Sequence, residues 1–377
     1  MRAIRWTGVA LLLTASCGEP QSSVVGAAGA GGGSASTGGA EAAGSGPVAG
    51  GGGGGATGVT AGSSGALAGT GPGGSVNANG GVGGSVAGAP TGGNGGGSAG
   101  AAGRGAGGAS SYEPVANAKF DELPLFEGQP PNLKLNAPAE SVNAQGSISN
   151  VSVPTLRRFP MDASKATGFG YIVFPGGAYT GLDMDTHATR LAERVGPQGV
   201  AVFALKYRVG GGSNDAERDA LIDAKRAVRM VKRNAARWGV TVEHVGVIGY
   251  SAGSHLALNL AGNFDSGNVI AADPVEQQSS RPAFVGSMST WAFYEPESPF
   301  TFPTGVPPVY FCHAEDDTLA PIALARTVDM QVRAKGGVTQ LDFYKTGGHS
   351  TCHPGDPKME GHDWPDKLWP WVQSALP

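Results

Sequence analysis

The chain has 377 residues, of which 65 are glycine, and its formal net charge is −4 at neutral pH. Lysine and arginine do not form the runs that follow a phosphate backbone, so a nucleic-acid-binding protein is not expected. Most of the glycine lies before residue 112, which leaves residues 112–377 to form one large folded domain.

Residues 1–17 have the pattern of a secretory signal peptide. Arg2 and Arg5 precede an apolar run at 8–13, which is too short to span a bilayer, and small residues lead to Cys17. The residues before Cys17 resemble a bacterial lipobox, although Thr14 stands where leucine is usual. An ordinary signal peptide with an incidental cysteine is the alternative. Both predict an extracytoplasmic protein, and lipidation of Cys17 would attach it to the cell envelope.

Residues 18–111 have the composition of a linker. Glycine, alanine, serine and threonine dominate from residue 26 onward, and charge is almost absent. Such a segment cannot bury enough apolar surface to fold, and it lacks the strict glycine period of collagen. A flexible coil of about 86 residues has a root-mean-square reach of roughly 50 Å. We expect a disordered tether, with no membrane contact apart from an anchor at Cys17.

The remaining sequence alternates predicted strands with predicted helices. Residues 148–159 predict one or two edge strands, because Pro154 is tolerated at an edge. Asn214 is expected to cap a long helix that ends before Gly239. Buried strands are expected at 170–174, 200–208, 245–248, 283–288, 309–313 and 341–345, and helices at 185–195, 214–238, 321–335 and 364–376, with a further helix that follows the turn at 249–253 and ends at 262. This alternation predicts an α/β fold with a mostly parallel central sheet and helices on both faces.

The segment 245–258 has the features of a nucleophile elbow. An apolar β-branched run leads to Gly-Tyr-Ser-Ala-Gly at 249–253, and an apolar helix opens directly after it. In such an elbow the serine, here Ser251, is held on a strained corner with its hydroxyl pointing out of the sheet. Side chains at Gly249 and Gly253 would collide with the neighbouring helix and strand. The backbone N–H of Ala252 lies at a helix N-terminus, where it can face a developing oxyanion.

A serine nucleophile needs a histidine base and a carboxylate that orients the base. In α/β hydrolases these follow the serine in the order acid, then histidine. Asp316 and Asp317 both follow the predicted strand at 309–313 and are the candidate acids. His349 follows a flexible glycine pair after the last predicted strand, which lets its imidazole fold back over the sheet edge. We therefore expect His349 to be the base.

The loop 175–179, Pro-Gly-Gly-Ala-Tyr, directly follows the predicted strand at 170–174. It stands where esterases carry a His-Gly-Gly-Gly loop, and its backbone N–H groups, at Gly177 and Ala178, would complete the oxyanion hole. A tight structural turn is the alternative.

The other histidines and the cysteines carry weaker signals. His187, His244 and His255 precede the acid in the chain and are expected to be structural. Cys312 and Cys352 either pair as a disulfide or stay as two buried thiols, and the sequence leaves both open. No metal or cofactor is expected, because the segment 352–363 shows no paired ligand spacing although it contains His353, His362, Cys352, Asp356 and Asp363.

From residue 123 to the C-terminus the chain resembles the bacterial acetyl-xylan-esterase-type α/β hydrolases, the group with BD-FAE-like domains. The motifs that carry the resemblance lie at 123–128, 150–155, 174–177, 205–208, 223–229, 249–257, 313–317 and 347–349. The resemblance implies hydrolysis of small acyl esters, often acetyl groups on plant polysaccharides such as xylan. The acid of this group commonly stands four residues before a proline. The resemblance therefore implies that Asp317, before Pro321, is the acid. Asp316 is then expected to make a loop or capping hydrogen bond.

The expected protein is therefore a monomeric serine esterase acting on ester-bearing carbohydrates or other small esters. Tyr179 and Trp291 are the candidate substrate contacts. Trp291 belongs to a group of aromatic residues that could line an open groove or could pack the domain edge: Trp291, Phe293, Tyr294, Phe300 and Phe302. The alternatives are a peptidase of the same fold and a catalytically inactive, tethered carbohydrate-binding protein. A glycosidase is not expected, because no carboxylate pair is recognisable.

Overall fold

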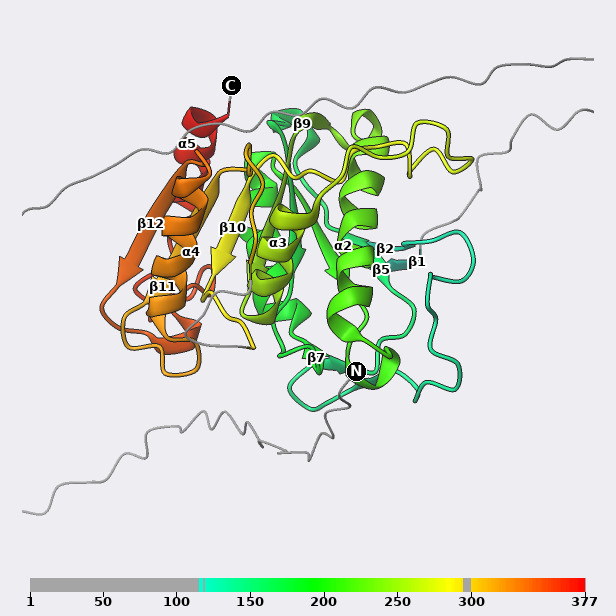
Figure 1. Cartoon of the computed structure of the whole chain (residues 1–377), viewed down its shortest axis with the longest axis horizontal. Helices are drawn as coiled ribbons and strands as arrows, with labels where there is room; N and C mark the ends of the chain where they lie inside the picture. Colours follow the sequence, from blue (N-terminus) through cyan, green and yellow to red (C-terminus); the bar gives the residue numbers. More distant parts are fainter. Residues whose placement is uncertain (1–114, 118, 294–299, 377) are drawn as a thin grey trace, which may run out of the picture. The chain divides into compact units, whose positions relative to one another are not determined.

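The computed structural model describes residues 115–117, 119–293 and 300–376 (Figure 1). The predicted signal peptide, Cys17, the linker and its boundary at residue 112 lie outside these ranges and stay predictions. None of the helices in the described ranges is long and apolar enough to cross a membrane.

Within the described residues, nine strands form one sheet in the order β1-β2-β5-β8-β6-β9-β10-β11-β12. The last six in this order are parallel: β8 (Ala201–Lys206), β6 (Gly168–Phe174), β9 (Val240–Tyr250), β10 (Val285–Met288), β11 (Val309–Ala314) and β12 (Thr339–Tyr344). The first three extend the sheet with antiparallel pairing: β1 (Val115–Asn117), β2 (Phe120–Pro124) and β5 (Thr155–Arg158). A small second sheet contains β3 (Ser141–Val142), β4 (Ile148–Ser149) and β7 (Gly181–Leu182).

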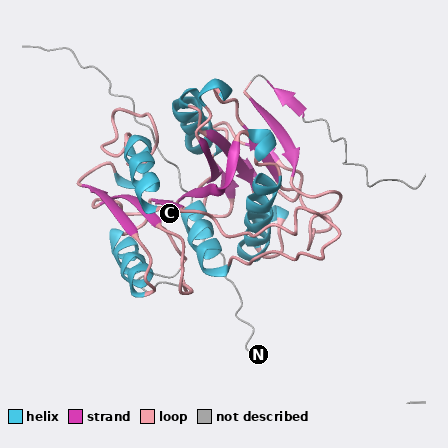
Figure 2. Ribbon diagram, turned by 90° about the horizontal axis from the view of Figure 1, so that it is seen from above, coloured by secondary structure: helices cyan, strands magenta, loops and turns pink. Residues whose placement is uncertain are grey.

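Helices cover both faces of the main sheet (Figure 2). One face carries α2 (Ala216–Arg233), α3 (Ala252–Asn263) and α4 (Ile322–Ala334), which lie in front of the strands in Figure 1. The other longer helices are α1 (Arg190–Val195) and α5 (Trp364–Ala375). Short helical turns lie at Ala163–Lys165, Asp185–Thr189, Gly196–Gln198, Gly210–Gly212, Ala236–Trp238 and Gly348–Ser350. Every residue of β8, β10 and β11 is buried, as expected for parallel strands covered on both faces. The predicted α/β-hydrolase fold is confirmed.

The connections around β6 place two loops side by side. From β6 the chain passes to β8 on one side, and after α2 it returns to β9 on the other side of β6. At such a switch point the loops at the carboxyl ends of neighbouring strands open a crevice, which is the usual ligand site of a doubly wound sheet. Here the loop after β6 begins at Pro175, and the loop after β9 contains Ser251.

Several local predictions are wrong. Within 148–159, β4 belongs to the small sheet, and β5 lies between β2 and β8 and is not an edge, because residues 115–124 supply two further strands. Asp215, not Asn214, caps α2 by accepting the N–H of Arg218 at 3.1 Å. This helix ends at Arg233, and Asn234 caps it: the side-chain amide of Asn234 donates to the Met230 carbonyl at 2.9 Å. The chain continues as a separate turn to Trp238.

Candidate active site

The turn from β9 into α3 holds Ser251 in an unusual backbone conformation. Its φ is 52°, in the left-handed region that a residue with a side chain rarely adopts. A Cβ on Gly249 would lie 2.0 Å from the Gly253 carbonyl oxygen, and a Cβ on Gly253 would lie 1.9 Å from the Phe174 carbonyl oxygen. The predicted need for both glycines is confirmed, and the tight packing imposes the corner that presents Ser251 at the end of the sheet.

Ser251, His349 and Asp317 are joined by two short hydrogen bonds. The Ser251 Oγ lies 2.8 Å from His349 Nε2, and His349 Nδ1 lies 2.8 Å from Asp317 Oδ2. The three residues come from the ends of β9, β12 and β11, so the carboxyl edge of the sheet assembles them. The Asp317 residue is 4% exposed, whereas the His349 side chain is 24% exposed. A substrate can thus reach the serine and the imidazole while the carboxylate stays sealed from water.

The surroundings of Asp317 favour its charged form. Its Oδ1 accepts the N–H groups of Leu319 and Ala320, both at 2.9 Å, and its Oδ2 lies 3.4 Å from His313 Nε2. Burial alone would raise the pKa of Asp317, but hydrogen bonds from His313, His349 and the Ala320 N–H outweigh it and hold this pKa well below its usual range. A charged carboxylate fixes the imidazole with its proton on Nδ1 and leaves Nε2 to accept the serine proton.

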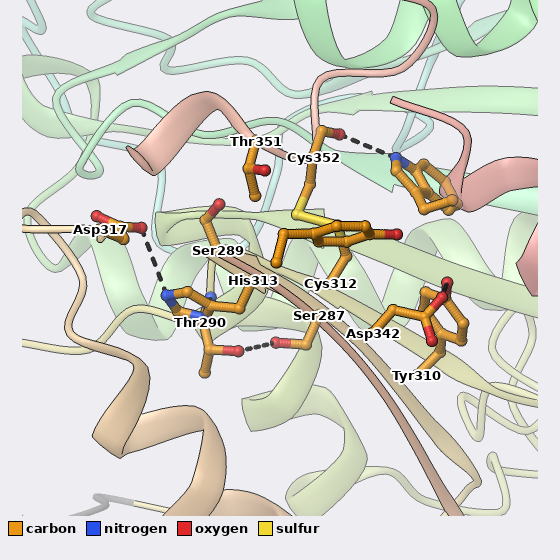
Figure 3. The surroundings of a disulfide bond; sticks show 12 residues. Ser287, Ser289, Thr290, Tyr310, Cys312, His313, Asp317, Asp342, Thr351 and Cys352 are labelled. Atoms are coloured by element: carbon orange, nitrogen blue, oxygen red, sulfur yellow. Dashed lines mark hydrogen bonds and ion pairs between the residues drawn. A yellow bond between two sulfur atoms is a disulfide. The ribbon is translucent and has the colours of Figure 1, made fainter. Parts of the chain in front are cut away.

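The loop that carries His349 is held from three sides. The N–H of Gly348 donates to Asp316 Oδ1 at 2.7 Å, which is the loop hydrogen bond predicted for Asp316. The Oγ of Ser289 donates to the His349 carbonyl at 2.9 Å. Cys352 is joined by a disulfide to Cys312 on β11, which resolves the two alternatives left by the sequence (Figure 3). Each anchor reduces the freedom of the imidazole relative to Ser251.

The loop after β6 passes directly beside the nucleophile. A Cβ on Gly176 would lie 3.1 Å from the Ser251 Cβ. The N–H of Gly176 donates to His187 Nδ1 at 3.2 Å, and the hydroxyl of Tyr207 donates to the Pro175 carbonyl at 2.6 Å. Burial lowers the pKa of His187 to about 3, so the lone pair on Nδ1 stays available to Gly176. The loop is therefore fixed before any substrate binds.

The N–H groups predicted to form the oxyanion hole are free to receive a ligand. Within the described part of the chain, the N–H groups of Gly177 and Ala178 have no hydrogen-bond acceptor. Ala252 is the first residue of α3, where a backbone N–H has no partner inside the helix. Gly177 has a φ of 140°, and a Cβ there would lie 2.1 Å from the Gly181 carbonyl oxygen, so only glycine fits.

Comparison with known proteins identifies the domain. Residues 161–283 match the BD-FAE family model. An acetylxylan esterase from Xylanibacter ruminicola is 29% identical over 91 residues, which are 24% of this chain and 18% of the relative. The crystal structure of an acetyl ester-xyloside bifunctional hydrolase from Caldicellulosiruptor lactoaceticus is 25% identical with a TM-score of 0.51, over 67% of this chain and 95% of that chain. Residues 161–283 therefore belong to a BD-FAE-like α/β-hydrolase domain.

Two motifs of this α/β hydrolase have structural roles that sequence reasoning missed. Tyr207 supports the loop after β6, as described above. Its neighbour Arg208 is fully buried and forms an ion pair with Asp223 of α2, at 2.7 Å from Nη2 to Oδ1 and 2.9 Å from Nε to Oδ2. The pair ties the end of β8 to α2 and so keeps Tyr207 in place. No residue pattern near Tyr207 indicates this contact, because it depends on how the two strand ends meet.

The predicted substrate contacts lie in two different environments. Tyr179 is 3% exposed, and its hydroxyl lies 2.9 Å from His255 Nδ1, so it supports the domain interior and presents no face to solvent. Phe300 and Phe302 are also buried. Trp291 is half-buried and packs against Phe293, which is 40% exposed, with the ring centroids 4.6 Å apart. Of the predicted aromatic group, Trp291 and Phe293 lie near the surface, and Tyr294 lies outside the described residues.

His255 of the hydrolase is expected to make stability depend on pH. Burial lowers its pKa from 6.5 to about 4. Between pH 6.5 and 4 the unfolded chain therefore binds a proton that the folded domain does not bind. The free energy of unfolding falls by about 1.4 kcal/mol for each pH unit over this range. Above pH 6.5 this contribution is constant. In His255→Gln the free energy of unfolding, measured with urea from pH 7 to 4.5, should fall less steeply by about that amount. Equal slopes in both proteins would contradict the assignment.

No group of three or more His, Cys, Asp or Glu residues in the described ranges is arranged to hold a metal ion. The groups gathered around Ser251 are a hydroxyl, an imidazole, a carboxylate and backbone N–H groups. These are the groups that acyl transfer through a covalent serine intermediate requires.

Proposed function

We propose that this protein is a serine esterase that removes small acyl groups, acetyl above all, from carbohydrates such as acetylated xylan. The observation that carries the proposal is the hydrogen-bonded series Ser251, His349 and Asp317, with both bonds at 2.8 Å, beside an oxyanion loop. The acetyl and carbohydrate parts of the proposal draw on the names of the two similar proteins and on Trp291 and Phe293, the aromatic residues near the surface.

In the acylation step, His349 Nε2 takes the proton of Ser251 Oγ as this oxygen bonds to the ester carbon. The carbonyl oxygen becomes an oxyanion, to which the N–H groups of Gly177, Ala178 and Ala252 donate hydrogen bonds. When the tetrahedral intermediate collapses, the bond to the sugar oxygen breaks and the proton on Nε2 passes to that oxygen. Asp317 accepts the Nδ1–H throughout and stabilises the imidazolium.

In the deacylation step, a water molecule takes the place of the sugar. His349 Nε2 takes a proton from this water as its oxygen bonds to the acyl carbon, and the same N–H groups receive the second oxyanion. The bond from the acyl carbon to Ser251 Oγ then breaks, and the proton returns to Oγ. The products are free acid and unchanged enzyme.

The short connection between β10 and β11 supports a preference for small acyl groups. β10 ends at Met288 and β11 begins at Val309. The connection, residues 289–308, is too short to form the deep apolar tunnel that long acyl chains require. Aromatic rings near the surface, here the half-buried Trp291 and the exposed Phe293, are suited to stacking on sugar rings.

We expect kcat/KM to be highest for nitrophenyl acetate and to fall as the acyl chain lengthens to octanoate. Trp291→Ala should weaken use of acetylated xylan more than use of nitrophenyl acetate, because the small ester does not need the sugar contact. The matched control is Trp371→Ala on α5, a half-buried tryptophan that packs on Tyr310, and it should change both substrates equally. A steady rise of kcat/KM from acetate to octanoate would contradict the small-acyl proposal.

Two rival functions make different predictions. A peptidase of the same fold would release amines from peptide substrates, whereas the proposed esterase releases acetate and no amine. An inactive, tethered carbohydrate-binding protein would not react with a serine-directed phosphonate, whereas the esterase should be labelled once, at Ser251. The intact geometry of the three residues favours the esterase over the inactive protein.

We further propose that a lipid at Cys17 and the linker hold this domain outside the cytoplasm. A protein that begins at Tyr112 is expected to keep its kcat on soluble esters, because the linker supplies no group to the site. Cys17→Ser is expected to move the full-length protein from the membrane fraction to the soluble fraction. Membrane association that persists in Cys17→Ser would count against lipidation, and activity lost in the shortened protein would count against a passive linker.

A further inference from the structure

His313 belongs to a sequence motif but has no part in the proton transfers described above. It lies on β11, four residues before Asp317, and is fully buried. Its Nδ1 accepts the backbone N–H of Thr290 at 3.1 Å. A ring nitrogen that accepts a hydrogen bond carries no proton, so the proton of this imidazole is on Nε2.

The Nε2–H of His313 points at the acid. It donates to the carbonyl of Ala320 at 2.7 Å and lies 3.4 Å from Asp317 Oδ2, and Figure 3 shows the imidazole directed towards this carboxylate. The same turn returns the N–H groups of Leu319 and Ala320 to Asp317 Oδ1. His313 therefore fixes the turn that binds one carboxylate oxygen and places a donor beside the other.

The segment that holds His313 also holds the base, His349. Thr290 is held by a hydrogen bond of 2.8 Å between its Oγ1 and Ser287 Oγ. The residue next to Thr290 is Ser289, which has a φ of 50° and whose Oγ donates to the His349 carbonyl. Two consecutive residues after β10 thus fix the acid, through His313, and the base, through its backbone. The distance between the acid and the base is therefore set by one short stretch of chain.

We propose that His313 is a positioning residue that fixes the carboxylate of Asp317 so that it orients His349. The inference rests on the proposed function, because it gives His313 a role only if Asp317 is the acid. The alternative is a histidine that satisfies buried hydrogen bonds and stabilises the fold without affecting catalysis.

Two amide substitutions separate these roles. In His313→Gln the side-chain amide can take the place of Nε2–H and still donate to Ala320 and Asp317. In His313→Asn the shorter amide can accept from Thr290 but cannot reach the turn. We expect kcat on nitrophenyl acetate to fall by about 10²-fold in His313→Asn, with KM changed less than about threefold, because small misplacements of a catalytic group have effects of this size. His313→Gln should recover at least about tenfold of the loss.

The substitutions are then repeated with Asp317→Asn. If His313 acts through Asp317, His313→Asn should lower kcat further by less than about threefold in this background, because the carboxylate it positions is already gone. The matched control is His244→Asn, a histidine that stacks on Phe169 and has no contact with the three site residues; its kcat should not change.

Equal losses of kcat in the two backgrounds, or equal kcat for His313→Asn and His313→Gln, would overturn the inference. So would a wild-type kcat in His313→Asn. If the His313→Asn protein does not fold, His313→Gln tests the inference by itself. Its kcat must then stay within about tenfold of the wild type. Failure of the proposed function is distinct, because it would appear as full activity in Ser251→Ala.

Discussion

Ser251→Ala is expected to abolish ester hydrolysis, with a fall in kcat of about 10⁶-fold, because no other group can form the acyl-enzyme. Within the described ranges the hydroxyl makes one hydrogen bond, to His349 Nε2. Alanine keeps the Cβ at the strained corner and adds no atom, so the elbow between β9 and α3 should be unchanged. The loss should therefore occur at unchanged thermal stability.

The measurement is a time course on nitrophenyl acetate, together with mass spectrometry after treatment with a serine-directed phosphonate. The wild-type protein should gain one adduct and the variant none. Ser280→Ala is the matched control, because it makes the same chemical change at a fully buried serine that lies before β10, in a loop whose hydrogen bonds go to Asp265. It should keep kcat and the adduct. Activity in Ser251→Ala close to that of the wild type would remove the nucleophile assignment.

The parts of the fold that the sequence predicts well are those set by neighbouring residues. The parallel strands are buried on both faces, so they are continuous apolar runs, and the elbow needs glycine at two fixed positions around Ser251. The strands β1 and β2 are not predictable in this way, because they depend on contacts with residues far away in the sequence. β2 carries Asp121 and Glu122, whose charges are met by Arg158 and Arg157 on β5, so its sequence shows no apolar alternation. These ion pairs form only once the sheet exists.

The supports of the candidate site could not be predicted, because they join residues far apart in the chain. The bond from Ser289 to the His349 carbonyl spans 60 residues, and that from Tyr207 to the Pro175 carbonyl spans 32. Serine and tyrosine occur in many positions, and nothing local distinguishes these two. The burial of Tyr179 was missed for a related reason: an aromatic residue beside a catalytic loop can face the substrate or the interior, and only packing decides which.

Asp317→Asn is expected to lower kcat by about 10⁴-fold, the effect seen when a triad carboxylate is replaced by its amide elsewhere. The reason is specific to the three contacts of this side chain. Its Oδ1 is committed to the N–H groups of Leu319 and Ala320, so an amide must place its NH₂ at the Oδ2 position, facing His349 Nδ1. That donor forces the imidazole to carry its proton on Nε2, which then cannot accept the proton of Ser251.

Asp316→Asn is the matched control, since it makes the same chemical change one residue away. Among the described residues Asp316 accepts a single hydrogen bond, from the Gly348 N–H, and the oxygen of an asparagine can accept it equally well. The His349 loop should keep its position, because the hydrogen bond from Gly348 is kept and the charge that is lost lies at the surface. We expect kcat to stay within about tenfold of the wild type. Both variants are compared on nitrophenyl acetate at saturating substrate, where KM does not contribute. If Asp316→Asn were the inactive protein and Asp317→Asn the active one, the hydrogen bond between His349 and Asp317 would not be the one that orients the base, and the loop would have to rearrange during turnover.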